Sequence, residues 1–304
     1  MSGSLKHLSG PPQGHHLGWP FAFAVASPIF FATFNNGLRL VSADIGVYGL
    51  LFLRGVVGVT LAIAVTYLTK TIPIVKKLGL LALTGLSGAL ASAATTTSIT
   101  MIPLYQAVVI LYLYPAMTVI MARILVGERI TIRALARVIT AFVGCVLLVL
   151  PGGDGGLSLS LGHAIGLLGA ALYALSYVLT RRLGQDHRGL EPFIFYCLAC
   201  MIVAFPLASV FSSGFGIDNL KELTLGLTLG SLGAGAQLMA FAALKHIPAH
   251  TVGVIGTLEI LCGTLSSWLL FSDPFTPIAV LGAAIVIYAA FGFRERRLPL
   301  EVTP

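Results

Sequence analysis

Two ionisable side chains stand alone in long apolar stretches, where a charged group could bind a ligand away from bulk water. Glu259 lies in TLEILCGTLSSWLLF, and Arg54 lies in LLFLRGVVGVTLAIAV. A charged group at the centre of a bilayer costs roughly 2.5–3.5 kcal/mol on insertion scales unless it is neutralised, paired or hydrated. Glu259 is therefore expected to face protein or water. It would either contact a cationic substrate or bind a proton, or serve as a buried acid tied to a neighbouring helix.

Arg54 has two interpretations of its own. As a structural anchor, its guanidinium would hold its helix to backbone carbonyls or to another side chain. As a substrate clamp, it would bind a carboxylate in a bidentate arrangement. Glu259 follows Pro248 by about eleven residues, and Arg54 lies about nine residues into its helix, so both sit at a similar depth at a rise of roughly 1.5 Å per residue. Whether the two side chains pair with each other stays open.

Uncharged polar and aromatic side chains could complete a binding site around Glu259 and Arg54. Tyr173 and Tyr177 are four residues apart and share one face of a helix. The further polar candidates are Asn35, Asn36, Tyr105, Gln106, His250 and Thr251. For each of these residues, the alternative to ligand binding is packing or placement at the membrane interface. The pattern predicts binding chemistry, with no catalytic group and no metal site.

These residues are placed by a duplicated unit. The stretch PLYQAVVILYLYPAMTVIMARILVGERIT, residues 103–131, returns without a gap 145 residues later as PAHTVGVIGTLEILCGTLSSWLLFSDPFT. The aligned pairs that define the register are Pro103 with Pro248, Glu128 with Asp273 and Thr131 with Thr276. We interpret Glu128 and Asp273 as caps of the helices that follow them. The repeats are expected over residues 17–151 and 162–295, with polar tails at 1–16 and 296–304.

The same register pairs the polar candidates across the two repeats. Tyr114 aligns with Glu259, and Ser92 aligns with Gln237. If a pseudo-two-fold axis passes through a central cavity, the members of each pair face each other across it. They would place an aromatic ring, a hydroxyl and an amide beside a carboxylate. For Ser92 and Gln237, a hydrogen bond between neighbouring helices is an equally good interpretation.

The composition places the chain in a membrane. Charged residues make up 10% of 304 positions, hydrophobic residues make up 57%, and the mean hydropathy is +0.96. Soluble domains carry roughly a quarter charged residues, so this chain is not expected to be a water-soluble globule. Ten apolar runs approach the length of about 20 residues that crosses a bilayer as a helix. They are 19–39, 45–69, 78–99, 103–125, 131–151, 162–182, 191–211, 222–244, 249–271 and 276–293.

The positive charges predict the orientation of these helices. The net charge of +7 comes from short basic clusters between apolar runs, which argues against a nucleic-acid partner. With a cytoplasmic N-terminus, fifteen Lys and Arg residues fall on the cytoplasmic side and two, Arg39 and Lys221, fall on the other. This bias puts both termini in the cytoplasm. Because each repeat holds five helices, the second repeat starts from the opposite face, which makes the two repeats inverted.

The four cysteines do not form a convincing metal or redox motif. Cys145, Cys197, Cys200 and Cys262 all lie inside apolar runs, where small thiols serve as packing residues. The spacing of Cys197 and Cys200 also fits a redox pair, but packing is the preferred interpretation. The N-terminal tail lacks the apolar core of a signal peptide and is expected to be disordered.

The repeated unit resembles the EamA unit of the drug/metabolite transporter superfamily. The resemblance is carried by LYPAMTVIMARILVGERIT in the first copy, by TLEILCGTLSSWLLFSDPFT in the second, and by Arg54 in the second helix. The second copy departs from the pattern with Asp273 where Glu is usual and Ile260 where Pro is common. The resemblance implies an all-α membrane protein with ten transmembrane helices as two inverted five-helix repeats. It also implies a central cavity lined mainly by helices one, three, four, six, eight and nine.

Together these features predict a secondary active transporter in a bacterial inner membrane that works by alternating access, as an exporter or an exchanger. The substrate is expected to be a small polar or amphipathic metabolite such as an amino acid or an amine. No ATP-binding motif and no cofactor motif is present, so protons or a counter-substrate would drive transport. The alternatives are a passive channel-like facilitator, a non-transporting membrane scaffold or sensor, and a membrane-embedded enzyme, for which the loops offer few acids or ligands. The sequence leaves the oligomeric state open.

Overall fold

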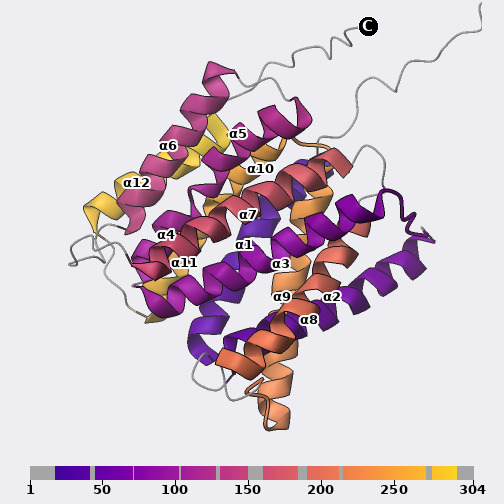
Figure 1. Cartoon of the computed structure of the whole chain (residues 1–304). Coiled ribbons are helices and arrows are strands. Elements are labelled where there is room, and N and C mark those ends of the chain that lie inside the picture. The colour runs from indigo at the N-terminus through magenta and orange to yellow at the C-terminus, as the bar shows by residue number, and fades with distance from the viewer. Residues whose placement is uncertain are drawn as a thin grey trace, which may run out of the picture.

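A computed structural model describes residues 18–41, 45–70, 72–102, 104–127, 131–149, 160–183, 190–211, 215–271 and 276–292. Within these ranges the regular secondary structure is entirely helical, in agreement with the predicted all-α class. The helices form one bundle in which elements far apart in the sequence lie side by side (Figure 1). The predicted tails and the predicted caps Glu128 and Asp273 lie outside the described residues.

The first half of the chain forms six helices: α1 (Gly18–Val41), α2 (Val47–Thr69), α3 (Leu78–Met101), α4 (Leu104–Leu111), α5 (Tyr114–Val126) and α6 (Ile132–Val149). The second half forms α7 (Leu161–Leu183), α8 (Glu191–Phe211), α9 (Leu220–Leu244), α10 (Ala249–Gly256), α11 (Leu258–Phe271) and α12 (Pro277–Ile287), followed by a π-helical turn, η2 (Tyr288–Gly292). Most of these bounds fall within a few residues of the predicted runs.

The prediction of continuous helices over 103–125 and 249–271 is wrong, because each is broken in two. In the first repeat Pro115 sits in the first turn of α5, where its ring and missing N–H prevent a helix from continuing through it. In the second repeat there is no proline at that position. There the Thr257 hydroxyl donates to the Val254 carbonyl at 2.6 Å, a local bond that competes with the helical pattern. The two breaks lie at aligned positions.

Seven described segments are long and apolar enough to cross a bilayer. They are Val47–Thr69, Leu78–Ile99, Gln106–Val126, Leu161–Leu183, Glu191–Val210, Leu220–Leu244 and Ala249–Ser266. Their side chains are only partly buried within the protein, and Ile63 and Ile202 are among the apolar residues left exposed. These segments make the chain a multi-pass membrane protein. The crossing of all ten predicted helices stays a prediction.

The helices pair across the two halves of the chain. Extensive contacts join α3 with α7, α1 with α9, α2 with α8, and α6 with α12 (Figure 1). When the two halves exchange places, the α3–α7 pair becomes the α9–α1 pair, and each of the other two pairs maps onto itself. This is the pairing expected if a two-fold axis relates the repeats.

Glycines allow some of these pairs to approach closely. A Cβ atom added at Gly85 of α3 would meet the Phe195 carbonyl of α8 and lie 2.8 Å from the Tyr196 amide nitrogen. At Gly230 of α9 it would lie 3.3 Å from the Arg54 amide nitrogen of α2. A Cβ atom added at Gly235 of the same helix would meet only one atom, in Phe30, at 3.9 Å. Close packing therefore involves one face of α9.

Arg137 is buried in α6, although the sequence placed it with the basic residues of a loop. Only 5% of its surface is exposed. Its Nε donates to the Ala289 carbonyl at 2.8 Å, and a terminal nitrogen donates to the Ala290 carbonyl at 2.9 Å. Both carbonyls belong to η2, where the wider turn of a π-helix replaces the α-helix predicted to residue 293. The arginine thus fastens the end of the second repeat to α6.

Threonine side chains begin the last helix of each repeat. The Ala134 amide donates to the Thr131 hydroxyl at 3.1 Å, and the Ala279 amide donates to the Thr276 hydroxyl at 3.3 Å. These bonds satisfy amide groups that have no partner within α6 or α12. The aligned threonines therefore make the same cap twice.

Replacing Gly85 with Ala is expected to destabilise the protein, because the added Cβ would meet backbone atoms of α8 that cannot rotate away. Overpacking of this kind costs about 1–3 kcal/mol. Gly79 of the same helix has no atom within 4 Å of such a Cβ, so Gly79→Ala should stabilise the helix by about 0.5–1 kcal/mol. Thermal unfolding of the purified variants in detergent measures both changes. Equal melting temperatures for the two variants would contradict the proposed contact.

Candidate functional site

The two helix breaks place Tyr114 and Glu259 in equivalent positions at the centre of the bundle. Tyr114 is the first residue of α5, and Glu259 is the second residue of α11. The first turn of a helix has amide groups without intrahelical partners and carries a partial positive charge. Each break therefore brings polar backbone, together with a polar side chain, into an otherwise apolar segment.

Glu259 is held by α1. The Asn35 side-chain amide donates to Glu259 Oε1 at 2.7 Å, and the neighbouring Asn36 amide donates to Ser266 Oγ of α11 at 2.6 Å. Tyr112, in the break between α4 and α5, also interacts with the Glu259 carboxyl group. Asn35 itself is exposed and Glu259 is only half-buried, so their hydrogen-bonded pair can be reached by a ligand.

Arg54 joins three helices around it. It is 4% exposed, and a terminal nitrogen donates to the Gln237 side-chain oxygen of α9 at 3.0 Å. Three aromatic rings surround its guanidinium carbon, with centroids 5.1 Å away for Phe31, 5.4 Å for Tyr196 and 5.6 Å for Phe34. Such contacts stabilise a desolvated cation. Among the described residues, Arg54 Nε has no hydrogen-bond partner, so one donor of this buried cation is unused.

Aromatic side chains fill the space between these two polar centres. The Tyr114 ring lies 5.7 Å from the ring of Tyr177, 6.1 Å from that of Tyr173 and 6.0 Å from that of Tyr112. Tyr173 and Tyr177 contact each other edge to face at 6.4 Å, as their spacing predicts. The Tyr114 hydroxyl donates to the Gly253 carbonyl of α10 at 3.1 Å. These rings, which we call the tyrosine cluster, connect α5 with α7 and α10.

Ser92 links the tyrosine cluster to the surroundings of Arg54. Its hydroxyl lies 3.1 Å from the hydroxyl of Tyr173 and 3.1 Å from that of Tyr196. Tyr196 in turn packs edge to face against Phe241 of α9 at 5.8 Å. The residues aligned by the repeat, Ser92 and Gln237, therefore each make a hydrogen bond between helices, and each bond involves a side chain of the site.

Some predicted residues lie elsewhere. Gln106 Oε1 accepts a hydrogen bond from His163 Nε2 at 2.9 Å, near the start of α7, away from the tyrosine cluster. His250 is buried in α10. Tyr105 lies in α4, but its side chain is outside the described part of the chain. Among the described residues, no group of three His, Cys, Asp or Glu side chains could hold a metal ion.

Sequence analysis did not select Tyr112, Tyr196, Phe31 or Phe34. Phe31 and Phe34 are three apart on α1 and precede Asn35, so a helical-face argument starting from that asparagine would have found them. Tyr196 follows Phe193 and Phe195 in an apolar run of α8, and nothing in its local sequence distinguishes it from those rings as a site residue. The site as assembled offers a carboxyl group, a cation, amides, hydroxyls and aromatic faces, which suits reversible binding of a small polar molecule with an aromatic ring.

Comparison with known proteins gives a family match, two related sequences and a similar solved structure. The sequence profile of the EamA-like transporter family matches residues 18–150 and 160–294. A riboflavin transporter of Rhizobium johnstonii is 24% identical over 244 residues, which cover 77% of this chain and 79% of that protein. A riboflavin transporter of Brucella anthropi is 25% identical over 196 residues, which cover 64% of this chain and 68% of that protein. A solved crystal structure superposes with a TM-score of 0.72 at 19% identity, covering 89% of this chain and 96% of that one, and supports the fold.

Replacing Gln237 with Leu is expected to lower the free energy of unfolding by about 1.5–3 kcal/mol, because the buried Arg54 loses its hydrogen-bonded partner. In the double variant Arg54→Leu/Gln237→Leu, the total loss should be smaller than the sum of the two single losses, since no unpaired charge remains. Ser231→Leu, at an exposed position of the same helix, is the control and should change stability little. Additive losses in this cycle would show that the two side chains do not interact.

Proposed function

The chain belongs to the EamA-like transporter family, and on that premise we propose that it is a secondary carrier that moves a small aromatic, polar metabolite by alternating access. The observation that carries the proposal is the Glu259–Asn35 pair beside the tyrosine cluster, at two aligned helix breaks. Breaks of this kind supply free backbone groups for a substrate without exposing them to lipid. The site joins both repeats, so a change in their relative position alters it.

The orientation of the repeats supports alternating access. We propose ten crossings, with two five-helix repeats inserted in opposite directions and both termini in the cytoplasm of a bacterial inner membrane. The excess of Lys and Arg in alternate loops favours this arrangement. Inverted repeats have two packings of similar energy that open to opposite sides of one central site. The helix pairs that map onto one another when the halves exchange are consistent with this mechanism.

The chemistry of the site favours a substrate that combines a flat ring with hydrogen-bonding groups. The tyrosine cluster offers aromatic faces and edges for stacking. Glu259, which is half-buried, can accept hydrogen bonds from hydroxyl groups of the substrate. Arg54 Nε is buried in this conformation and would donate to a ring carbonyl only in one that exposes it. A flavin has both parts, and riboflavin is the substrate named for the two relatives. We therefore propose riboflavin as the first substrate to be tested, in export or exchange.

An aromatic amine or amino acid is the second candidate. A cationic amino group would be attracted by the Glu259 carboxylate and by the faces of neighbouring tyrosines. The two candidates differ in charge, so they can be separated by competition. If riboflavin transport is inhibited by other flavins and not by aromatic amines, the flavin is the substrate. The reverse result would assign the site to amines.

Transport by purified protein in liposomes tests the proposal. Because the sequence has no ATP-binding motif, a proton gradient or a counter-substrate is expected to drive the flux. Riboflavin uptake should saturate with concentration and should be accelerated by riboflavin on the opposite side. A flux that rises linearly, without acceleration by substrate on the opposite side, would indicate a passive facilitator. Liposomes without protein provide the background rate.

Glu259→Gln is expected to abolish transport or to uncouple it from the driving gradient, because the amide cannot bind a proton or carry negative charge. Membrane insertion and the melting temperature should change little, since glutamine can still accept a hydrogen bond from Asn35. Asp218→Asn makes the same chemical change at an exposed position before α9 and is the matched control. Transport by Glu259→Gln at the normal rate and with unchanged pH dependence would exclude Glu259 from the mechanism.

Two substitutions of Tyr173 separate the contribution of its aromatic ring to substrate binding from that of its hydroxyl. Tyr173→Leu should raise the KM for riboflavin by roughly 2- to 10-fold, which corresponds to the loss of one aromatic contact worth about 0.5–1.5 kcal/mol. Tyr173→Phe keeps the ring and loses only the hydrogen bond to Ser92, so its KM should stay close to that of the original protein. Initial rates in liposomes measure both values. A larger effect of Tyr173→Phe than of Tyr173→Leu would contradict stacking.

A further inference from the structure

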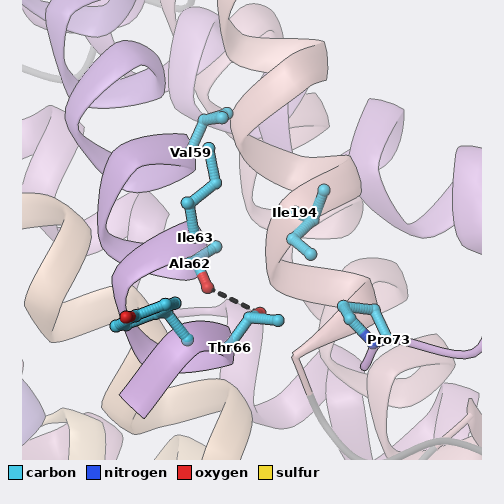
Figure 2. A pocket seen from close by; sticks show the side chains of 7 residues that line it. Val59, Ala62, Ile63, Thr66, Pro73 and Ile194 are labelled. Carbon is cyan, nitrogen blue, oxygen red and sulfur yellow. Dashed lines mark hydrogen bonds between the residues drawn. The ribbon is translucent and has the colours of Figure 1, made fainter. Parts of the chain in front are cut away.

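A groove of about 420 Å³ opens between α2 and α8, on the side of the bundle away from α6 and α12 (Figures 1 and 2). Its volume lies within the range of roughly 300–1,000 Å³ that is usual for small-molecule sites. The groove is lined by Val59, Ile63, Thr66 and Tyr67 of α2, Pro73 of the following loop, and Ile194 of α8. None of these residues belongs to the central site.

The wall of the groove is apolar. The Thr66 hydroxyl is directed to its own helix, where it donates to the Ala62 carbonyl at 2.8 Å (Figure 2). The rest of the lining consists of the Tyr67 ring and the aliphatic side chains of Val59, Ala62, Ile63, Pro73 and Ile194. A ligand for this groove must therefore be a hydrocarbon chain or another apolar group, because a polar ligand would find no hydrogen-bonding partner on this wall.

The groove opens toward lipid. Ile63 is 65% exposed, and Leu68, one turn further along α2, is 78% exposed. Large apolar side chains at this exposure on a membrane-spanning helix face the acyl chains of the bilayer. Tyr67, at the end of the groove, has the amphipathic ring that is enriched at the membrane–water interface. The groove therefore ends at the depth where lipid headgroups lie.

Three lysines lie within four residues of Pro73, which lines the groove. Lys70 follows α2 directly, and Lys76 and Lys77 precede α3; all three are exposed. The loop between them carries the exposed apolar residues Ile72 and Val75, which places it in the interface with its charges toward the headgroups. The loop is fixed on α8, because the Ile74 amide donates to the carboxylate of buried Glu191 at 2.9 Å. The charges thus hold a defined position relative to the groove.

We propose that the groove between α2 and α8 is a binding site for an anionic phospholipid of the surrounding bilayer. One acyl chain lies in the groove against Val59, Ile63 and Ile194, and the phosphate group lies among Lys70, Lys76 and Lys77. Apolar walls that open to the acyl chains, with a cluster of positive charge at headgroup depth, match the two parts of such a lipid. In the orientation proposed above, this end of the groove faces the cytoplasmic leaflet.

The proposed lipid would join the two helices that enclose Arg54. Arg54 lies on α2, and Tyr196, which contacts its guanidinium, lies on α8. A chain that fills the groove adds dispersion contacts to both helices, which the apolar walls otherwise lack on one side. The lipid is therefore expected to stabilise the packing of α2 on α8, and a rise in melting temperature on lipid binding provides a second measurement.

Native mass spectrometry of the purified full chain tests the site. The protein in detergent is titrated with phosphatidylglycerol and, separately, with phosphatidylcholine that has the same acyl chains. The original protein should bind phosphatidylglycerol at least about tenfold more tightly, since each lysine near an anionic headgroup contributes roughly fivefold. Lys70→Gln/Lys76→Gln/Lys77→Gln should reduce this preference by at least about tenfold. The variant Arg123→Gln/Arg133→Gln/Arg182→Gln removes the same charge at other exposed positions and should leave the preference unchanged.

A second variant tests the groove itself. Thr66→Phe places an aromatic ring in the groove and should weaken phosphatidylglycerol binding while the lysines stay in place. Equal binding of both lipids, or equal effects of the lysine and arginine variants, would overturn the proposal. So would efficient oxidative cross-linking of Leu68→Cys between two copies of the chain in liposomes, because that result would identify a second copy as the occupant of this face. The melting temperature of each variant is measured without added lipid, so that a loss of lipid binding is separated from a loss of folding.

Discussion

A charged or polar group within the hydrocarbon layer must find its partners inside the protein, and the structure around Arg54 and Glu259 follows from that requirement. Arg54 obtains an amide oxygen from Gln237 and three aromatic rings, while Glu259 obtains the amide of Asn35. The partners come from different helices, so satisfying two side chains fixes the rotation of α1 and α9 about their own axes. The same packing requires small residues such as Gly230 and Gly233, which leave room for the Arg54 side chain.

The backbone polar groups at the broken helices must also find their partners inside the protein. A break in a membrane helix leaves carbonyl and amide groups without partners, and it is stable only where protein or a ligand supplies them. Here the Thr257 hydroxyl and the Tyr114 hydroxyl bind carbonyls of α10, and the side chains that follow the breaks belong to the candidate site. The breaks are therefore part of the site. In the proposed mechanism, their position at the junction of the two repeats would connect substrate binding with the relative movement that a carrier needs.

The two proposed binding sites use apolar surface in different ways. In the centre, aromatic rings lie next to a carboxyl group and a cation, which suits a ligand that is polar along one edge. Between α2 and α8, the wall is apolar and the charges lie only at its end. A soluble metabolite fits the first arrangement and a phospholipid fits the second. Helices α2 and α8 take part in both, since Arg54 and Tyr196 lie on their inner faces and the groove lies on their outer side.

The sequence by itself determined the helical class, the duplicated unit and the approximate helix bounds, and it predicted that Glu259 and Arg54 lie at a similar depth. These properties depend on composition, on local periodicity and on the 145-residue register, all of which can be read along a single chain. Only the tertiary structure decided that Arg54 binds Gln237, that Glu259 binds Asn35, that Tyr196 joins the site, and that the second repeat breaks at Thr257 without a proline. The first three features depend on how each helix is rotated and which helix packs against it, and contacts between residues more than a hundred positions apart decide both. The break at Thr257 involves a local bond to Val254, but no proline marks it in the sequence.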